Sequence, residues 1–386
     1  MKILILAEYV RRYHWMPGAW VPALARGLAA RGHDVTVAVD GTEDPALFAG
    51  SRLRVRRPHR TMRGSTPLAF QRWAMELVND RAFDSTLSLT TLAPGAVWAP
   101  VGGSFIGGFI SMALSHAGVS AVLETIARPW LPAAALAERR AKAIANRMGA
   151  IECRIGMLAA PAGVRPLGYA SIAEHWPLLA PVGAQASKGQ VRGAARRALG
   201  LDDSRPAVVV SAVHPRRPGF GAFLGAIESL GPDLAPTVLV LGRKPYSVER
   251  LAKRHGGLWA LRFLGPTAQI PAVMAAADLA ASPWSRARGA TSGRFVADAL
   301  RHGRPVLAHM HSPGAELIEP SHFGTPEIGT IVREESPVAW AAALRSSMES
   351  LALGQTTRAA RDVSGALSLD GMCARLEAVL REAARQ

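Results

Sequence analysis

The stretch GATSGRFVADALRHGRPVL, from Gly289 to Leu307, has the composition of a helix start that could hold a ligand. Small residues and glycine form a turn, and the apolar helix that follows carries a single acid, Asp298. Glycine lets a backbone approach a ligand closely, and the free N–H groups of a helix start favour an anion. The alternative is an ordinary turn in which Asp298 pairs with a neighbouring side chain.

A pair of arginines, Arg216 and Arg217, follows the apolar run AVVVSAV in the segment HPRRPGF. Ligands of open α/β sheets bind at the carboxyl ends of the strands, and paired guanidinium groups suit a diphosphate. Two exposed loop arginines would give the same pattern. Near the N-terminus, Gly18 stands in a Pro-Gly turn before the first predicted helix. This turn lacks the full GxGxxG spacing, which argues against the usual dinucleotide site. Any strand-to-helix turn could also use such a glycine.

No motif identifies a catalytic side chain. His14 and His116 are candidates only as polar residues in suitable regions, and a lone histidine is more often structural or exposed. Cys153 and Cys373 lie far apart without a CxxC spacing, so we expect neither a disulfide framework nor a zinc site. This cysteine usage fits a reducing compartment.

The composition is that of a folded protein with a surplus of positive charge. The chain has 386 residues, 49% of them apolar and 19% charged, and its length favours two domains. The net charge is +16, and the segment from Arg52 to Arg63 is dense in arginine. Such a segment attracts nucleic acid, anionic lipid or a phosphorylated glycan, although a solvated basic loop is an equal alternative. Nucleic acid is the weakest of these partners because no stacking aromatics interleave with the arginines.

No segment of the sequence has the pattern of a membrane span or a signal peptide. There is no run of about 18 apolar residues, and the first apolar run meets Glu8 too early for a signal peptide. We therefore expect a cytoplasmic protein. The predicted helix from Pro132 to Met148 is rich in alanine and arginine, and its basic face would suit a membrane surface, although an ordinary solvated helix is the alternative.

Apolar strand-like runs alternate with helical periodicity along almost the whole chain, which predicts parallel sheets covered by helices. The alternation occurs in two series, separated by a stretch rich in Pro, Gly, Ser and charge that begins near Pro181. We predict an N-terminal domain over 1–180 and a C-terminal domain over 181–370. The last helix, within 371–386, has an apolar face that must pack on something, and the first domain is one option.

Four segments together resemble the retaining glycosyltransferases of family 4, and the resemblance extends from end to end of the chain. They are GAWVPALARGLAARGHDVTV, HPRRPGF, LRFLGPTAQIPAVMAAADLAASPW and ADALRHGRPVLA. The spacing around PGAVWAPVGG and HPRRPGF is most similar to the lipopolysaccharide-core glucosyltransferases. The resemblance implies an α/β protein of GT-B fold, with two doubly wound Rossmann-like domains facing a cleft. It also implies a nucleotide-sugar donor that is linked to UDP or GDP, and no metal or other cofactor.

The resemblance assigns roles to individual residues of the opening stretch. The family has two glutamates with seven residues between them, the first contacting the donor sugar and the second the ribose. Asp298 stands at the second position, and Ala290 occupies the first, so the sugar contact is absent. Between them, Thr291, Ser292 and Gly293 would present backbone N–H groups to the phosphates.

The remaining donor contacts come from two other segments. Arg216 and Arg217 match the region of the family's Arg-Lys pair, with Pro218 as an extra residue, and would neutralise the diphosphate together with the turn at Gly18. The strand end formed by Phe263, Leu264 and Gly265 would lie near the base, or belong to the core.

The resemblance, together with the basic segment from Arg52 to Arg63, predicts a glycosyltransferase that acts with retention on an envelope or lipid-linked glycan and associates with the inner membrane face. Ala290 motivates the alternative, a noncatalytic protein that binds sugar nucleotides or glycans and has kept the fold.

Overall fold

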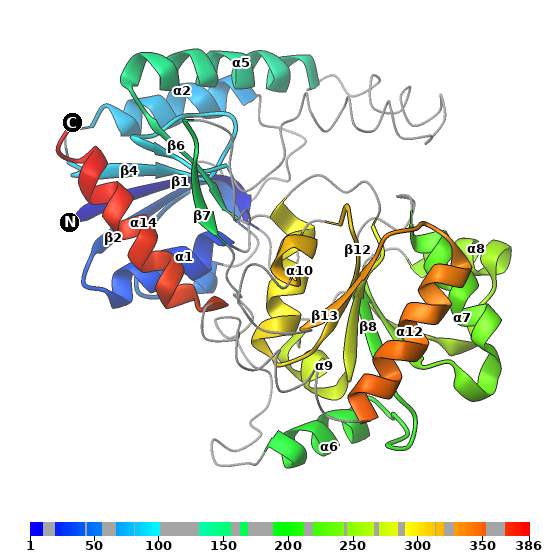
Figure 1. Ribbon diagram of the computed structural model, residues 1–386. Helices are drawn as coiled ribbons and strands as arrows, with labels where there is room; N and C mark the ends of the chain where they lie inside the picture. Colours follow the sequence, from blue (N-terminus) through cyan, green and yellow to red (C-terminus); the bar gives the residue numbers. More distant parts are fainter. Residues whose placement is uncertain are drawn as a thin grey trace.

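The computed structural model shows two α/β domains, each built on one parallel sheet (Figure 1). It describes residues 1–10, 20–42, 45–55, 67–80, 82–100, 131–155, 163–168, 188–211, 219–242, 245–265, 270–284, 290–312, 314–319, 328–352 and 367–386.

The first domain is organised around a sheet of seven strands in the order β3-β2-β1-β4-β5-β6-β7. Neighbouring strands pair in parallel throughout. The order reverses beside β1, which is the mark of a doubly wound sheet. Its strands are β1 (Lys2–Val10), β2 (Asp34–Thr42), β3 (Arg52–Val55), β4 (Ser85–Ser88), β5 (Val97–Trp98), β6 (Ile151–Ile155) and β7 (Arg165–Gly168).

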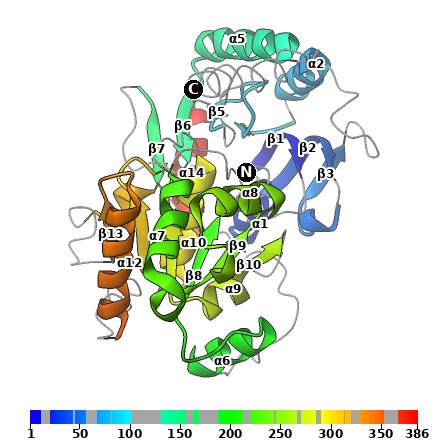
Figure 2. The ribbon, with the colours of Figure 1, turned by 90° about the vertical axis from the view of Figure 1, so that its right-hand side faces the viewer.

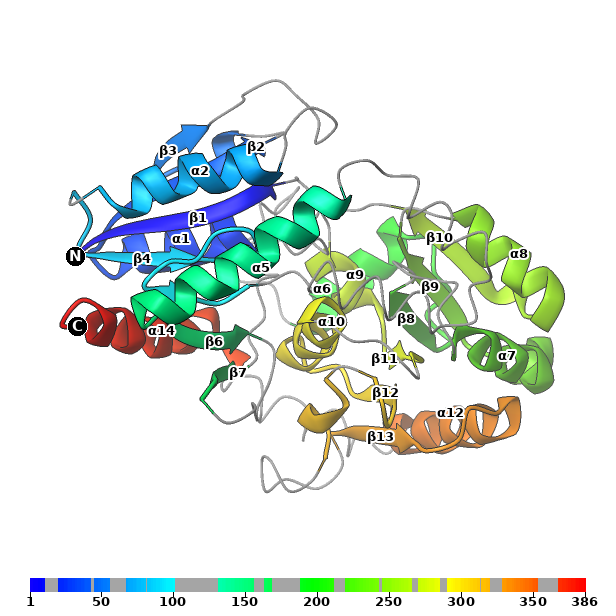
Figure 3. The same cartoon turned by 90° about the horizontal axis from the view of Figure 1, so that it is seen from above.

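Helices cover both faces of this sheet, which explains why its central strand is apolar on both sides. In β1, Ile3 and Ile5 join one core cluster, whereas Leu4 and Leu6 join another on the opposite face. The first face is covered by α1 (Trp20–Ala30) and α14 (Leu369–Ala383), and the second by α2 (Pro67–Val78) and α5 (Leu131–Met148) (Figure 3). A short 3₁₀ helix, η2 (Pro45–Phe48), packs beside α1.

The second domain contains a six-stranded parallel sheet in the order β10-β9-β8-β11-β12-β13. Here the order reverses beside β8. Its strands are β8 (Ala207–Ser211), β9 (Thr237–Leu241), β10 (Leu261–Gly265), β11 (Leu279–Ser282), β12 (Val306–His309) and β13 (Gly329–Val332).

The helices of the second domain also divide between two faces of their sheet. One core cluster joins the sheet to α6 (Lys188–Ala198), α9 (Ile270–Ala276) and α10 (Ala290–Arg301). The other joins it to α7 (Phe220–Leu234), α8 (Pro245–His255) and α12 (Pro337–Ala352), with α7 and α12 side by side (Figure 2). Two 3₁₀ helices complete the described elements, η5 (Leu258–Ala260) and η6 (Ala315–Leu317).

The predicted α/β architecture is confirmed, and the apolar run AVVVSAV contains a strand, β8, as expected. The predicted boundary near Pro181 lies outside the described residues and stays a prediction. The last helix, α14, contributes Met372, Cys373 and Leu376 to the core of the first domain. No described helix is both long enough and apolar enough to cross a membrane.

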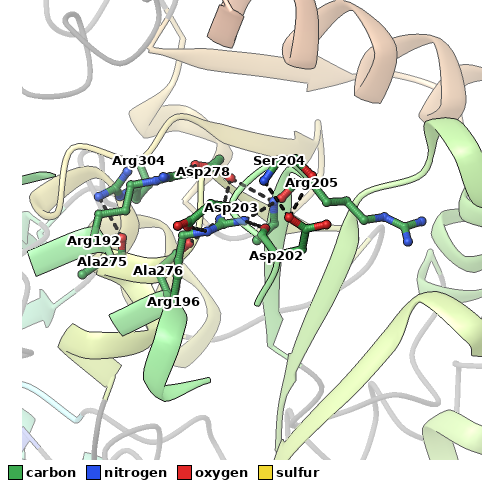
Figure 4. Close-up of polar contacts among 11 residues, drawn as sticks. Arg192, Arg196, Asp202, Asp203, Ser204, Arg205, Ala275, Ala276, Asp278 and Arg304 are labelled. Carbon is green, nitrogen blue, oxygen red and sulfur yellow. Dashed lines mark hydrogen bonds and ion pairs between the residues drawn. The ribbon is translucent and has the colours of Figure 1, made fainter. Parts of the chain in front are cut away.

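A buried arginine connects α6 to the edge of the second sheet where its strands begin (Figure 4). The Arg196 guanidinium donates to Asp203 at 2.9 Å and to Asp278 at 3.1 Å. It also donates to the backbone carbonyls of Ala276, Asp202 and Arg205. Asp278 in turn accepts hydrogen bonds from the Ala207 N–H, at 2.9 Å, and from Arg192. Hydrogen bonding on this scale allows a charged group to be fully buried.

An ion-pair cluster fastens α14 to the first domain. Glu377 accepts hydrogen bonds from Arg31 at 2.8 Å and from Arg381 at 2.7 Å, and lies 3.4 Å from the Nε2 atom of His33. Arg31 also donates to Asp370 at 2.8 Å. The hydrogen bonds from Arg31 and Arg381 lower the pKa of Glu377 to about 2.

This cluster predicts an acid-sensitive attachment of α14. The pKa of Glu377 is lower in the folded chain than its ordinary value of 4.5, so its stabilising contribution is present above that value and is lost as the pH falls from about 4.5 towards 2. We expect Glu377→Gln to lower the melting temperature at pH 7 and to make it less sensitive to pH between 5 and 3 than that of the native chain. Melting curves of both proteins, recorded at pH 7 and between pH 5 and 3, measure these differences in melting temperature. Equal pH sensitivity in the two proteins would contradict the prediction.

Candidate nucleotide-sugar site

The candidate site lies where the strands of the second sheet end, because parallel strands bring their carboxyl ends to one edge. At this edge α7 follows β8 and α10 follows β11. Phe220, the first residue of α7, stacks on Trp284 just beyond β11, with ring centroids 5.4 Å apart and planes inclined by 11°. Both rings are buried. This contact holds the start of α7 over the end of β11, which is the strand that leads into α10.

The first turns of α10 bury a charged pair. Arg294 and Asp298 are 2% and 3% exposed, and the Arg294 Nε atom lies 3.8 Å from the Asp298 Oδ2 atom. Burial lowers the pKa of Arg294 to about 10, a shift that the neighbouring Asp298 opposes. The guanidinium nevertheless remains charged at neutral pH. The local pairing considered from the sequence is therefore present, whereas ribose binding by Asp298 stays a prediction.

The loop after β12 reaches the start of α10. Gly314 has a φ of +86°, and a Cβ atom added there would lie 2.9 Å from both the Gly293 Cα and the Val296 Cβ. Nearby, the Oγ atoms of Ser282, at the end of β11, and Ser312 are 2.6 Å apart and buried. Two strand ends and the helix start are thus in direct contact, and Gly293, one of the predicted phosphate-binding residues, lies at their junction.

His309 ends β12 in a buried position beside this loop. Burial lowers its pKa, His311 lowers it further, and Glu335 has the opposite effect. The imidazole is therefore neutral at pH 7. Its Nδ1 atom accepts a hydrogen bond from the His311 N–H at 3.2 Å, which assigns the proton to Nε2.

Gly314, Ser282, Ser312 and His309 were not found by sequence reasoning. The available signal was their position directly after apolar strands, at the ligand edge of the sheet. It was too general to distinguish them from other loop residues. Arg294 was missed as well, although its separation of four residues from Asp298 is readable in the sequence.

The contact between Gly314 and α10 leads to a further prediction. Gly314→Ala places a methyl group against backbone atoms of α10 and on a left-handed backbone, so we expect a loss of about 1–3 kcal/mol in folding free energy. The displaced loop should also weaken UDP binding. Thermal melts and UDP titration test both effects. Gly163→Ala is the matched control, because Gly163 has a φ of +81° but no atom within 4 Å of the added Cβ.

The other predicted site residues have varied placements. Phe263 and Leu264 in β10, the edge strand, pack against opposite core clusters, which agrees with the core alternative. Gly265 ends that strand with a φ of +62°. Ala290 and Ser292 lie in the first turn of α10. Outside the described residues lie Gly18, His14, His116, Arg216 and Arg217.

The first domain also presents a polar group where its strands end. Glu8, near the end of β1, accepts a hydrogen bond from the Thr90 hydroxyl at 2.5 Å. Burial raises the pKa of Glu8, the Thr90 hydrogen bond opposes that shift, and the nearby carboxyl groups of Asp40 and Glu138 add to it. A carboxyl group that keeps its proton to higher pH can donate a hydrogen bond to a hydroxyl-bearing ligand. In the sequence, Glu8 could be recognised as an acid that directly follows the apolar run ILILA.

Among the described residues, no three His, Cys, Asp or Glu side chains come close enough together to hold a metal ion.

Residues 205–350 match the protein family described as glycosyl transferases group 1. Over nearly its whole length, the chain is similar in structure to WaaG, a glycosyltransferase involved in lipopolysaccharide biosynthesis, with a TM-score of 0.69, 17% identity, and coverage of 98% of this chain and 99% of that one. The chain therefore has the GT-B fold. No curated protein matches its sequence.

Two further solved structures show the same fold. Sucrose-phosphate synthase from Thermosynechococcus elongatus has a TM-score of 0.62 and 15% identity, with 99% of this chain and 98% of that chain covered. HepE from Anabaena, in complex with UDP-glucose, has a TM-score of 0.63 and 15% identity, with 99% and 100% covered. The family match contains the whole ligand edge from β8 to β13, including α10 and the Gly314 loop.

Proposed function

We propose that this protein is a glycosyltransferase that transfers a sugar, with retention, from a UDP- or GDP-linked donor. The observation that carries the proposal is that the family match over 205–350 contains the ligand edge of the second sheet, where α10 contacts Gly314. HepE is similar in structure and was solved with UDP-glucose. In the reaction, the bond between the anomeric carbon and the diphosphate oxygen breaks, a bond to an acceptor hydroxyl oxygen forms, and the proton of that hydroxyl leaves with the nucleoside diphosphate.

The chain's own residues would stabilise the departing diphosphate. Negative charge grows on its oxygens as the bond breaks, and positive groups fixed in place lower the barrier. In this proposal Arg216, Arg217 and the turn at Gly18 contribute to that role, and the N–H groups of Ser292 and Gly293 point to the phosphates. Asp298 accepts hydrogen bonds from the ribose, and the nucleotide-sugar is a substrate, with no further cofactor.

We propose an envelope or lipid-linked glycan as the acceptor, and a place in the cytoplasm at the inner membrane face. The similarity to WaaG, a lipopolysaccharide-biosynthesis enzyme, and the arginine-rich segment support this acceptor class. Within that segment, the Arg52 Nη2 atom lies 3.3 Å from the Asp34 Oδ2 atom, and the Arg54 Cζ atom lies over the Phe83 ring, 5.6 Å from its centroid. The segment's other arginines lie outside the described residues.

Nucleotide titration followed by a donor screen tests the proposal. We expect UDP or GDP to bind more tightly than ADP in calorimetry, and the matching nucleotide-sugar to be hydrolysed or transferred by the pure protein. Failure of all three nucleotides to bind would reject the donor site.

Ala290 favours one second candidate, a protein that binds sugar nucleotides without turning them over. Glutamate is usual at this position in the family that the sequence resembles, and alanine cannot make its contact with the donor sugar. Tight nucleotide binding with no turnover across the donor panel would establish this noncatalytic function. If Ala290→Glu then gained turnover, the missing side chain would be the cause.

A further inference from the structure

Three large apolar side chains are exposed at the edge of the second sheet where its strands begin. Leu234 is 61% exposed, Leu258 is 39% exposed and Trp259 is 45% exposed. Leu234 ends α7, shortly before β9, and the other two belong to η5, directly before β10. Because β9 and β10 are neighbouring parallel strands, their starts lie side by side. Exposed apolar side chains that cluster, unlike isolated ones, indicate a binding surface.

Arg205 connects these side chains. It precedes β8, the next strand of the sheet, and its Cζ atom lies over the Trp259 ring, 5.8 Å from the centroid. The same guanidinium donates to the carbonyls of Pro232 at 2.6 Å and Ala235 at 3.0 Å, which lie on either side of Leu234 in the chain. Figure 4 shows the Arg205 side chain extending away from the buried network drawn beside it. The segments before three adjacent strands therefore form one surface.

Glu228 of α7 holds the Trp259 indole in place. The indole Nε1–H donates to the Glu228 Oε2 atom at 2.9 Å, and the Gly257 N–H donates to the same oxygen. A Cβ atom at Gly256 would collide with the Glu228 side chain, so this loop packs directly on it. The hydrogen bonds from Gly257 and then from Trp259 lower the pKa of Glu228, which is therefore ionised at neutral pH. An exposed ring that is already fixed loses little further freedom when it binds a ligand.

Two polar groups of this surface keep unused hydrogen-bonding capacity within the part of the chain that the structure describes. Glu228 accepts both of its hydrogen bonds at Oε2, which leaves Oε1 as an acceptor. Arg205 donates from Nε and Nη2, which leaves Nη1 as a donor. The carboxylate lies at the N–H edge of the Trp259 indole, and the guanidinium lies over its ring. A ligand that matches this surface must combine an apolar face with both donors and acceptors of hydrogen bonds.

We propose that Arg205, Glu228 and Trp259 form a noncatalytic site that binds a glycan chain. The C–H groups on the face of a pyranose ring pack on the exposed part of the indole, as apolar groups do on aromatic rings. The sugar hydroxyls both donate and accept, so they can satisfy the Glu228 carboxylate and the Arg205 guanidinium. A protein partner fits less well, because an apolar protein surface would remove water from these two charged groups without replacing the lost hydrogen bonds.

This glycan site is separate from the candidate nucleotide-sugar site. It lies where β8, β9 and β10 begin, whereas the ligand edge lies where the strands of the same sheet end. Each of these strands has five residues, which corresponds to about 15 Å along the strand. A sugar held here is therefore not the one that reacts. The site would keep the protein attached to a glycan chain, and it goes beyond the proposed function because it does not depend on sugar transfer.

Titration of the whole protein with oligosaccharides tests this site. The probes are cellohexaose, maltohexaose and the core oligosaccharide of lipopolysaccharide, and binding is measured by calorimetry and by tryptophan fluorescence. We expect at least one probe to bind, and Trp259→Ala to lower its association constant by at least about 10-fold, because the sugar loses its packing on the ring. Trp259→Phe keeps an aromatic face and should lose less. Val338→Ala removes another exposed apolar side chain of the second domain, from α12, and is the control that should leave binding unchanged.

Several outcomes would overturn the proposal. They are binding of none of the three probes, an equal loss in Trp259→Ala and Val338→Ala, or displacement of the bound oligosaccharide by saturating UDP, which would place the sugar at the ligand edge. A native dimer that becomes a monomer in Trp259→Ala, with no probe bound, would assign the surface to contact between two copies of the chain. UDP affinity should be the same in every variant, so its measurement separates a failure of the glycan site from a failure of the proposed donor site. Melting curves verify folding.

Discussion

Asp298→Ala should weaken UDP binding by about 100-fold, the loss expected when a carboxylate no longer accepts the ribose hydrogen bonds. The same substitution removes a counter-charge 3.8 Å from the buried guanidinium of Arg294. Breaking a buried pair by removing one partner costs about 3–5 kcal/mol, so we also expect a lower melting temperature. Calorimetric titration with UDP and thermal melts measure the two effects on the same protein.

A second variant separates these two effects. Asp298→Ala combined with Arg294→Met removes both charges, so much of the lost stability should return. If Asp298 binds the ribose, UDP affinity remains low in the double variant. Recovery of UDP affinity together with stability would show that Asp298 serves only to pair with Arg294. Asp298→Glu restores the usual acid of the resembled family and should retain binding.

Arg196→Met should destabilise the second domain by about 3–5 kcal/mol. Methionine fills a similar volume but cannot replace the hydrogen bonds to Asp203, Asp278 and three backbone carbonyls (Figure 4). For a domain of this size, such a loss corresponds to a fall of about 6–20 °C in melting temperature. Thermal unfolding monitored with and without UDP would assign the affected transition to the second domain.

The neighbouring residue provides a matched control. Arg197 follows Arg196 on the same helix but is exposed, so Arg197→Met should change stability by less than about 0.5 kcal/mol. Similar losses in both variants would mean that the α6 charge, and not the buried network, stabilises this edge. UDP affinity should be nearly unchanged in the folded Arg196→Met protein, because the network lies at the opposite end of the strands from the ligand edge.

Much of the fold could be predicted because it depends on local patterns. The runs ILILA and AVVV are apolar at every position, as expected for strands covered on both faces, and they lie in β1 and β8. The helix predicted from Pro132 to Met148 is α5. The candidate site was predicted only in outline, at the start of α10, because a turn that can bind an anion has a recognisable composition.

Residues that depend on distant partners could not be found in this way. Glu8 and Thr90 are separated by 82 positions, and so are Arg196 and Asp278. Gly314 appeared in the sequence as one more loop glycine. Its importance comes from Gly293, against which the chain places it.

The sequence by itself determined the alternation of strands and helices and the two series of that alternation, and it predicted a ligand site at the start of α10. Each of these follows from residues close together in the chain, whose backbone preferences and apolar spacing act locally. Only the tertiary structure decided that the Arg294–Asp298 pair is buried, that Gly314 packs on Gly293, and that α14 returns to the first domain. Those contacts depend on which surfaces the folded chain brings together, and burial then sets the charge and hydrogen bonding of each group.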